Sequence, residues 1–284
     1  MNIIRKIKIS MSITRSLIRL ISTTIPTMPT IPTQSLKYKT NGKFQYVSDI
    51  HFEYNEKIKI MPDSENLIIA GDLGNPFNKG FFKFFSYVSP MFKKIIFVAG
   101  NHDLHESCVY NDFLYNYCKN KINDVCRQFD NVYFLDNDYH IHNNDIVIIG
   151  TPLWTHLSSN LKLSKKEYEL HNKKHFESVK FIEDICKKYE NKKIIVVSHY
   201  VPTLRLIEGK YKLNGDVNSK WVTNLENVMS KYSNINAWIC GHTHSVQSIK
   251  INCLTHSVNC MINAHGYNSE NSVILTKTFD LFKN

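Results

Sequence analysis

The residues most able to do chemistry in this sequence directly follow short apolar stretches. In "GHTH", His242 and His244 stand two positions apart, just after "AWIC". Two imidazoles can bind a divalent transition-metal ion, but the chain holds 13 histidines, so this spacing alone is a weak signal. The pair becomes informative only if further ligands follow other strands in the same way.

Polar residues do follow four other apolar stretches. They are Asp49 and His51 in "DIH", Asp72 in "GD", Asn101, His102 and Asp103 in "GNHD", and His199 in "SH". Any one of them could be a polar residue that caps a strand or opens a turn. Their shared position favours a metal site, because open α/β sheets place ligand crevices at the carboxyl ends of their strands.

The sequence offers more candidate metal ligands than one ion can bind. Two aspartates, one asparagine and four histidines give seven ligands, whereas a single ion takes about four to six. We therefore expect two divalent ions about 3.5–4 Å apart, with one carboxylate bridging them. Two dications, two carboxylates and one bridging hydroxide leave a charge of roughly +1, which suits an anionic phosphate. Nitrogen and oxygen donors without thiolate favour Mn, Fe or Zn over Mg.

The elements that must position these residues alternate between strand and helix. Strand-like stretches are "KFQYVS", "NLIIA", "KIIFVA", "DIVIIG", "KIIVVS" and "NAWIC". Helical period or length marks "NKGFFKFFSYVSPMF", residues 106–127 and residues 162–190. The alternation predicts a layered α/β domain. Several strand-like pieces between about Ser245 and Phe279 predict that the chain closes with antiparallel sheet.

The basic charge is concentrated before this domain. The net charge is +10, but residues 1–40 hold seven lysines and arginines and no acid, so residues 41–284 are close to neutral. This distribution disfavours nucleic acid as a partner. Pro26, Pro29 and Pro32 place the domain boundary near residue 41. We expect a basic, disordered extension over residues 1–40, with a mitochondrial-type targeting peptide as the alternative.

Composition indicates an ordinary soluble protein. Residues 41–284 are long enough for one catalytic α/β domain, and no apolar run of the extension could span a bilayer. The seven cysteines are odd in number and include no C-x-x-C pair, which predicts reduced thiols. A cytoplasmic location follows, or an organellar one if residues 1–40 are a targeting peptide. The sequence carries no signal for an oligomeric state.

Taken in order, "DIH", "GD", "GNHD", "SH" and "GHTH" resemble the five blocks of the calcineurin-like metallophosphoesterases, over about residues 43–280. "TPLWTHL" and "NAHGYNSE" further resemble the small single-domain branch of predicted phosphohydrolases. The resemblance implies a four-layer α/β/β/α sandwich. It also implies roles: Asp49, His51 and His244 bind one ion, Asn101, His199 and His242 bind the other, Asp72 bridges them, and His102 faces the leaving group.

The chain departs from the protein Ser/Thr phosphatases of that superfamily. Those enzymes carry an acid three positions after the bridging aspartate, an arginine just before "GNH" and another arginine after the fourth histidine block. Here Asn75, Ala99 and "YVPT" occupy these places, which disfavours a protein phosphatase. Asn75 also removes the usual partner of the catalytic histidine. Asp103 could orient His102 instead, but a direct neighbour is better suited to capping the next helix.

Other residues are weaker candidates. Arg205, six positions after His199, could clamp a phosphate or lie on the surface. Trp154 and His156 follow a strand and could wall the substrate pocket, although a buried tryptophan is nearly as good an interpretation. His171 and His175, four positions apart on a predicted helix, have no acidic partner, and we interpret them as structural.

These observations predict a dinuclear metal-dependent hydrolase of a small phosphomonoester or phosphodiester. A hydroxide that bridges the two ions would attack phosphorus, and His102 would protonate the departing oxygen. One alternative is a nuclease that uses the basic extension as an electrostatic arm. Another is a non-catalytic scaffold, which would be expected to have lost ligands.

Overall fold

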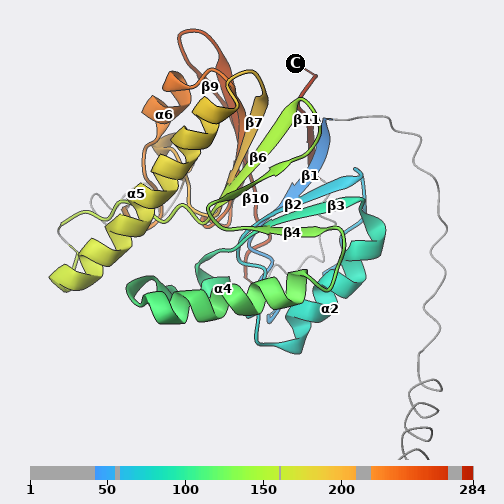
Figure 1. The fold of residues 1–284 in the computed structure, drawn as a ribbon, viewed down its shortest axis with the longest axis vertical. Helices are drawn as coiled ribbons and strands as arrows, with labels where there is room; N and C mark the ends of the chain where they lie inside the picture. The colour runs from blue at the N-terminus through green and yellow to red at the C-terminus, as the bar shows by residue number, and fades with distance from the viewer. Residues whose placement is uncertain (1–41, 55–57, 160, 209–218, 268–276, 284) are drawn as a thin grey trace, which may run out of the picture. The chain divides into compact units, whose positions relative to one another are not determined.

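Two sheets occupy the centre of the computed structural model, which describes residues 42–54, 58–159, 161–208, 219–267 and 277–283 (Figure 1). The predicted extension, residues 1–40, lies outside these ranges. In spatial order, the first sheet contains β11 (Thr278–Asp280), β1 (Lys43–Val47), β2 (Asn66–Ala70), β3 (Lys94–Val98) and β4 (Val132–Leu135). The second contains β5 (Asp138–Ile141), β6 (Ile146–Thr151), β7 (Lys193–Ser198), β8 (Ile235–Cys240), β10 (Ser257–Asn263) and β9 (Val246–Asn252).

Most neighbouring strands are parallel. Strands β1 to β4 pair in parallel, as do β6, β7, β8 and β10. The expected antiparallel ending is only partly correct. Strand β9 is antiparallel to β10, and β11 is antiparallel to β1, but β10 runs parallel to β8 with Asn259 opposite Ala237.

Helices cover the outer faces of the sheets. α2 (Lys79–Val88) and α4 (Asp112–Cys126) lie beside the first sheet, and α5 (Lys165–Lys188) and α6 (Glu226–Lys231) beside the second (Figure 1). The helix expected over residues 106–127 is interrupted, because the Asn111 side chain accepts the backbone N–H groups of Phe113 and Leu114 and starts α4. A short 3₁₀ turn, η2 (Glu106–Tyr110), precedes it.

Strand residues are buried on both sides. Ile68 and Ala70 of β2 pack between the two sheets, whereas Leu67 and Ile69 of the same strand pack toward the helices. This two-sided burial explains why the strands read as continuous apolar runs. The layers are helix, sheet, sheet and helix, which confirms the predicted α/β/β/α sandwich.

The two sheets are joined at the ends of β1 and β10. The N–H of Ser48 donates to the carbonyl of Asn263, and Ser48 forms an isolated parallel bridge with Ala264. Each of these residues directly follows or ends its strand, so the carboxyl edges of the two sheets lie together. In the ranges that the structure describes, none of the helices is long and apolar enough to cross a membrane.

Candidate metal centre

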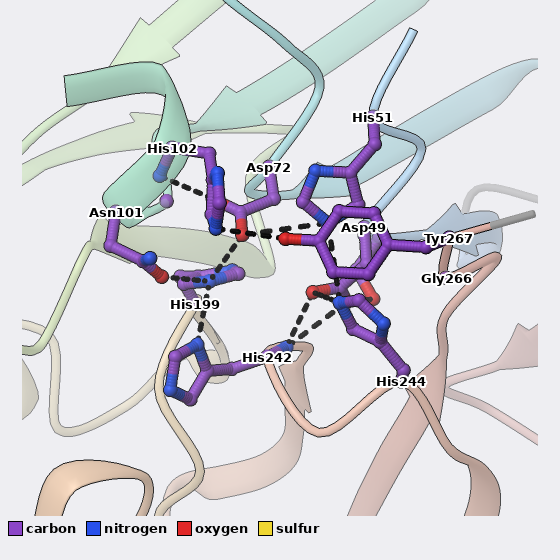
Figure 2. A network of polar contacts seen from close by, with 12 residues as sticks. Asp49, His51, Asp72, Asn101, His102, His199, His242, His244, Gly266 and Tyr267 are labelled. Carbon is purple, nitrogen blue, oxygen red and sulfur yellow. Dashed lines mark hydrogen bonds and ion pairs between the residues drawn. The ribbon is translucent and has the colours of Figure 1, made fainter. Parts of the chain in front are cut away.

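The carboxyl ends of five parallel strands bring the predicted donors together (Figure 2). Five of them are almost completely buried, namely Asp49, His51, Asp72, Asn101 and His199. His242 and His244 are partly exposed. Side chains of this kind lose their hydration on burial, so their polar atoms need partners. In this site those atoms point toward one another.

Asp49, His51 and His244 form one group of potential metal ligands. Nε2 of His51 lies 3.2 Å from Nε2 of His244, which lies 3.6 Å from Oδ1 of Asp49. Two nitrogens bound to one ion at about 2.1 Å are roughly 3.0–3.4 Å apart in octahedral or tetrahedral geometry. The spacing of the two imidazoles therefore fits a shared ion.

Asp72, His199 and His242 form a second group. Nε2 of His199 is 3.3 Å from Oδ2 of Asp72, 3.2 Å from Nδ1 of His242 and 3.0 Å from Oδ1 of Asn101. These separations also match those of ligand atoms around one ion, so this group, with Asn101, fits a metal as well.

Asp72 lies between the two groups (Figure 2). Its Oδ2 is 3.8 Å from Nε2 of His51 in the first group and 3.3 Å from Nε2 of His199 in the second. Its Oδ1 accepts the backbone N–H of His102 at 2.9 Å. That hydrogen bond fixes the carboxylate and leaves Oδ2 facing both groups.

Backbone and hydroxyl groups hold the donors in place. The Asp49 carboxylate accepts hydrogen bonds from the hydroxyl of Ser48 and from the N–H of His242. Nδ1 of His199 lies 3.0 Å from the carbonyl of Ala70, so the neutral ring would carry its hydrogen on Nδ1, with Nε2 toward the other donors. This tautomer is the one that a metal ligand needs.

The backbone of the site is strained. Asp49, His51, Asp72, His242 and His244 all have φ values between 46° and 71°, a region that residues other than glycine seldom adopt. The cost is roughly 1–2 kcal/mol for each residue, and such strain concentrates at functional sites. Asp49 and His51 thus join one group although neither has an extended backbone.

Glycines of the motifs make room for the donors. Gly71 has φ +88°, and a Cβ there would collide with the ring of His199. A Cβ at Gly100 would collide with the carboxylate of Asp72. The glycines of "GD" and "GNHD" therefore allow close contact between neighbouring strand ends.

The family model for calcineurin-like phosphoesterases matches residues 43–246, well over half of the chain and every donor described above. The chain belongs to the calcineurin-like phosphoesterase family. It is a metal-dependent phosphoric ester hydrolase, and its Asp and His groups are able to bind metal. The non-catalytic scaffold considered from the sequence is not supported.

The chain is also similar to individual proteins. The chain is 29% identical over 268 residues to "Uncharacterized protein L509" of Acanthamoeba polyphaga mimivirus, an alignment that covers 80% of this chain and 93% of the relative. Among solved structures, it is similar to the phosphopantetheinyl hydrolase (PptH) of Mycobacterium tuberculosis, with TM-score 0.59 and 17% identity over 80% of this chain and 90% of that one. At this identity, the second comparison supports the fold alone.

Burial and charge set the protonation of this phosphoesterase site. Burial raises the pKa of Asp49 to about 6. It also opposes ionisation of Asp72, but the imidazole of His199 outweighs burial and lowers the pKa of Asp72. Burial disfavours a charged His199, yet the Asp72 carboxylate raises the pKa of His199 to about 9. A divalent ion must displace the proton of His199, so metal binding releases a proton.

Asn75 stands where the acid that usually partners the catalytic histidine would be, and neither Asn75 nor Asp103 takes over that role. The Asn75 side chain accepts the N–H of Phe77, and Asp103 accepts the N–H groups of Gly74 and Gly100. Asp103 thereby caps α3 (Asn101–Leu104), the short helix that carries it. Its carboxylate is engaged by the backbone and has no hydrogen bond to His102 within the described ranges.

Within the described ranges, the weaker candidates make no direct hydrogen bond, ion pair or ring contact with the donors. Arg205 is exposed in η3 (Leu204–Leu206), with its guanidinium 3.9 Å from Glu226. His156 is exposed, and its ring lies 5.3 Å from that of Phe176 on α5. Trp154 is 1% exposed and packs against Tyr200, whose ring lies 4.2 Å from that of His242.

His171 and His175 of α5 are buried, as expected for structural residues. Nδ1 of His175 lies 2.8 Å from the carbonyl of Trp154, and Nε2 of His171 lies 3.4 Å from the hydroxyl of Thr155. These contacts attach α5 to the segment after β6. Burial lowers the pKa of both rings, that of His171 to about 4.

Acid is therefore expected to destabilise the protein through His171. An unfolded histidine has a pKa of about 6.5, so below that pH the unfolded chain binds a proton that the folded chain excludes. The free energy of unfolding should fall by about 2–3 kcal/mol from this residue as the pH decreases from 7 to 4. Urea denaturation of wild type and His171→Gln across this range measures the difference. An equal pH dependence in both proteins would contradict the prediction.

Two residues near the donors escaped the sequence analysis. Oε1 of Glu53 lies 3.7 Å from Nδ1 of His51, where metal-binding histidines usually have an outer partner. The hydroxyl of Tyr267 lies 3.0 Å from Nε2 of His102. Glu53 could have been found by extending the alternate spacing of "DIH" to "DIHFE". Tyr267 lies in the quoted stretch "NAHGYNSE", but its position depends on tertiary structure.

Proposed function

We propose that this phosphoesterase hydrolyses a small phosphomonoester or phosphodiester with two divalent ions. Asp49, His51 and His244 would hold one ion and Asn101, His199 and His242 the other, with Asp72 as the shared ligand. The observation that carries the proposal is the position of the Asp72 carboxylate, whose Oδ2 faces one histidine of each group at 3.8 and 3.3 Å. A carboxylate that served one ion would have no reason to face both.

When bound, the ions act as Lewis acids on the phosphoryl oxygens and lower the pKa of a water molecule. The donors contain four imidazoles and no thiolate, a set that suits Mn, Fe or Zn better than Mg. We assign metal binding and hydrolysis to residues 41–284, because every donor comes after residue 48 in the sequence.

His102 is the residue that we assign to the leaving group. Its side chain is exposed, and its ring stands edge-on to that of His51 with centroids 4.9 Å apart. Its backbone N–H donates to Asp72, which fixes the residue beside the two groups. An imidazole held there can give a proton to the departing oxygen.

The test is hydrolysis by the metal-stripped protein after reconstitution with Mn, Fe, Zn or Mg. The panel contains aryl phosphate monoesters and diesters, nucleotides and single-stranded DNA, and metal per chain is measured by elemental analysis. We expect turnover of a small ester with two ions per chain. Saturation at one ion would contradict the dinuclear site. Turnover of DNA alone would favour the nuclease alternative.

A further inference from the structure

The catalytic candidate His102 has an unexpected neighbour. The hydroxyl of Tyr267, 165 residues further along the chain, lies 3.0 Å from Nε2 of the His102 ring (Figure 2). Within the described ranges, this is the one side-chain hydrogen bond that reaches the ring. Asn75 and Asp103 accept backbone N–H groups, and neither makes a hydrogen bond to the ring in the described structure.

The backbone just before Tyr267 is hydrogen-bonded to the segment that supplies the donors Asp49 and His51. The N–H of His265 donates to the carbonyl of Ser48, and the N–H of Gly266 donates to the carbonyl of Asp49. Gly266 has φ +79°, and this turn directs Tyr267 over the site. The tyrosine ring then packs against His51 and His244, with centroid distances of 4.2 and 4.7 Å.

We propose that Tyr267 is a positioning residue that holds the ring of His102 toward the leaving group. It takes the place of the acid that Asn75 removes. Because the hydroxyl occupies Nε2, the proton for the leaving group would come from Nδ1 of His102, and Nε2–H would donate to the tyrosine oxygen before and after the transfer. It also adds no negative charge beside Asp49 and Asp72. The inference rests on the proposed function of His102.

The decisive variant is Tyr267→Phe, which keeps the ring and removes the hydroxyl. With alkyl phosphate esters, we expect kcat to fall roughly 3- to 10-fold, the range for loss of one neutral hydrogen bond, with little change in KM. With nitrophenyl esters, whose leaving group needs no proton, the loss should nearly disappear. Both ions should remain bound.

Tyr54→Phe is the matched control. Tyr54 is 64% exposed, and its ring lies 5.6 Å from that of Tyr267 at the same edge of the site. The described structure gives its hydroxyl no hydrogen bond to His102. Removing this hydroxyl should leave kcat unchanged with every ester.

A double variant separates positioning from direct contact with the substrate. If Tyr267 acts through His102, adding Tyr267→Phe to His102→Ala should cost nothing further. An additive loss, an equal loss with every leaving group, or loss of metal from Tyr267→Phe would each overturn the inference. These outcomes differ from failure of the proposed function, in which wild type hydrolyses no ester.

A measurement without turnover completes the test. Nitrogen-15 NMR of the histidine side chains reports the Nε2 resonance of His102, which is assigned by its absence from His102→Ala. We expect Tyr267→Phe to shift this resonance and Tyr54→Phe to leave it in place. An unchanged resonance in Tyr267→Phe would overturn the inference even if no substrate had been found.

Discussion

Replacing Asp72 with asparagine is expected to reduce hydrolysis more than about 10²-fold and to weaken the binding of both ions. Removing a residue that only hydrogen-bonds to a metal ligand already lowers metal affinity or activity about 10- to 100-fold. Asp72 is placed to contact both ions directly. Asparagine keeps the shape of the side chain and can still accept the N–H of His102. It loses the negative charge that opposes two dications. Metal per chain and kcat should therefore fall together.

Asp136→Asn is the control for this experiment. Asp136 also follows a parallel strand of the first sheet, β4, and is buried, but its carboxylate contacts Tyr115 and Lys119. The control variant should keep two ions and its activity, whatever it loses in stability. An Asp72→Asn protein that retained two ions and full activity would exclude a shared ligand at this position.

Replacing His102 with alanine is expected to reduce turnover of alkyl phosphate esters roughly 10²- to 10⁴-fold, the range for a positioned proton donor. Nitrophenyl esters should lose far less, because nitrophenolate departs without a proton. Both ions should stay bound, since the ring contributes no ligand atom to either proposed ion. Kinetics over a series of leaving-group pKa values, with metal content measured in parallel, tests this expectation.

Two other results would assign His102 differently. An equal loss with every ester, with both ions present, would mean that the imidazole binds the phosphoryl group and does not protonate the leaving group. Loss of metal would mean that His102 is itself a ligand. The second result is a real alternative, because His102, His51 and Glu53 also lie close enough together to hold an ion.

The strands that build the site were predictable because they are buried on both faces. β2 is the clearest case: all five of its residues are buried, so "NLIIA" stands out as an apolar run. β4 and β5 were missed because they are short, and β5 also because it is exposed. Each has four residues, and "DYHI" of β5 is partly or fully exposed throughout, so no hydrophobic pattern marks it. The break at Asn111 depended on a side-chain cap that helical period does not reveal.

Convergence of the donors was also predictable, because parallel strands end at one edge of a sheet. Their division between two groups did not follow from spacing and was expected only from the resemblance to the family. Asp49 and His51 are two positions apart and join one group, whereas His242 and His244 have the same spacing and join different groups. All four residues have positive φ, so the alternation of an extended strand does not apply to them. Tyr267 was beyond prediction, because only tertiary structure brings it to His102.

The two sheets meet at the donor site, along a line that we call the seam, and this arrangement determines when the metal site can form during synthesis of the protein. His51 and His244 meet across 193 residues, and neither group of donors is complete until β8 has been synthesised and docked. A ribosome-bound chain that ends before residue 242 therefore completes neither group of donors. The proposed ions can therefore bind only after both sheets have formed, and they would link the two sheets across the seam. Their contribution grows with the free metal concentration, by about 2.7 kcal/mol at a hundred times the dissociation constant.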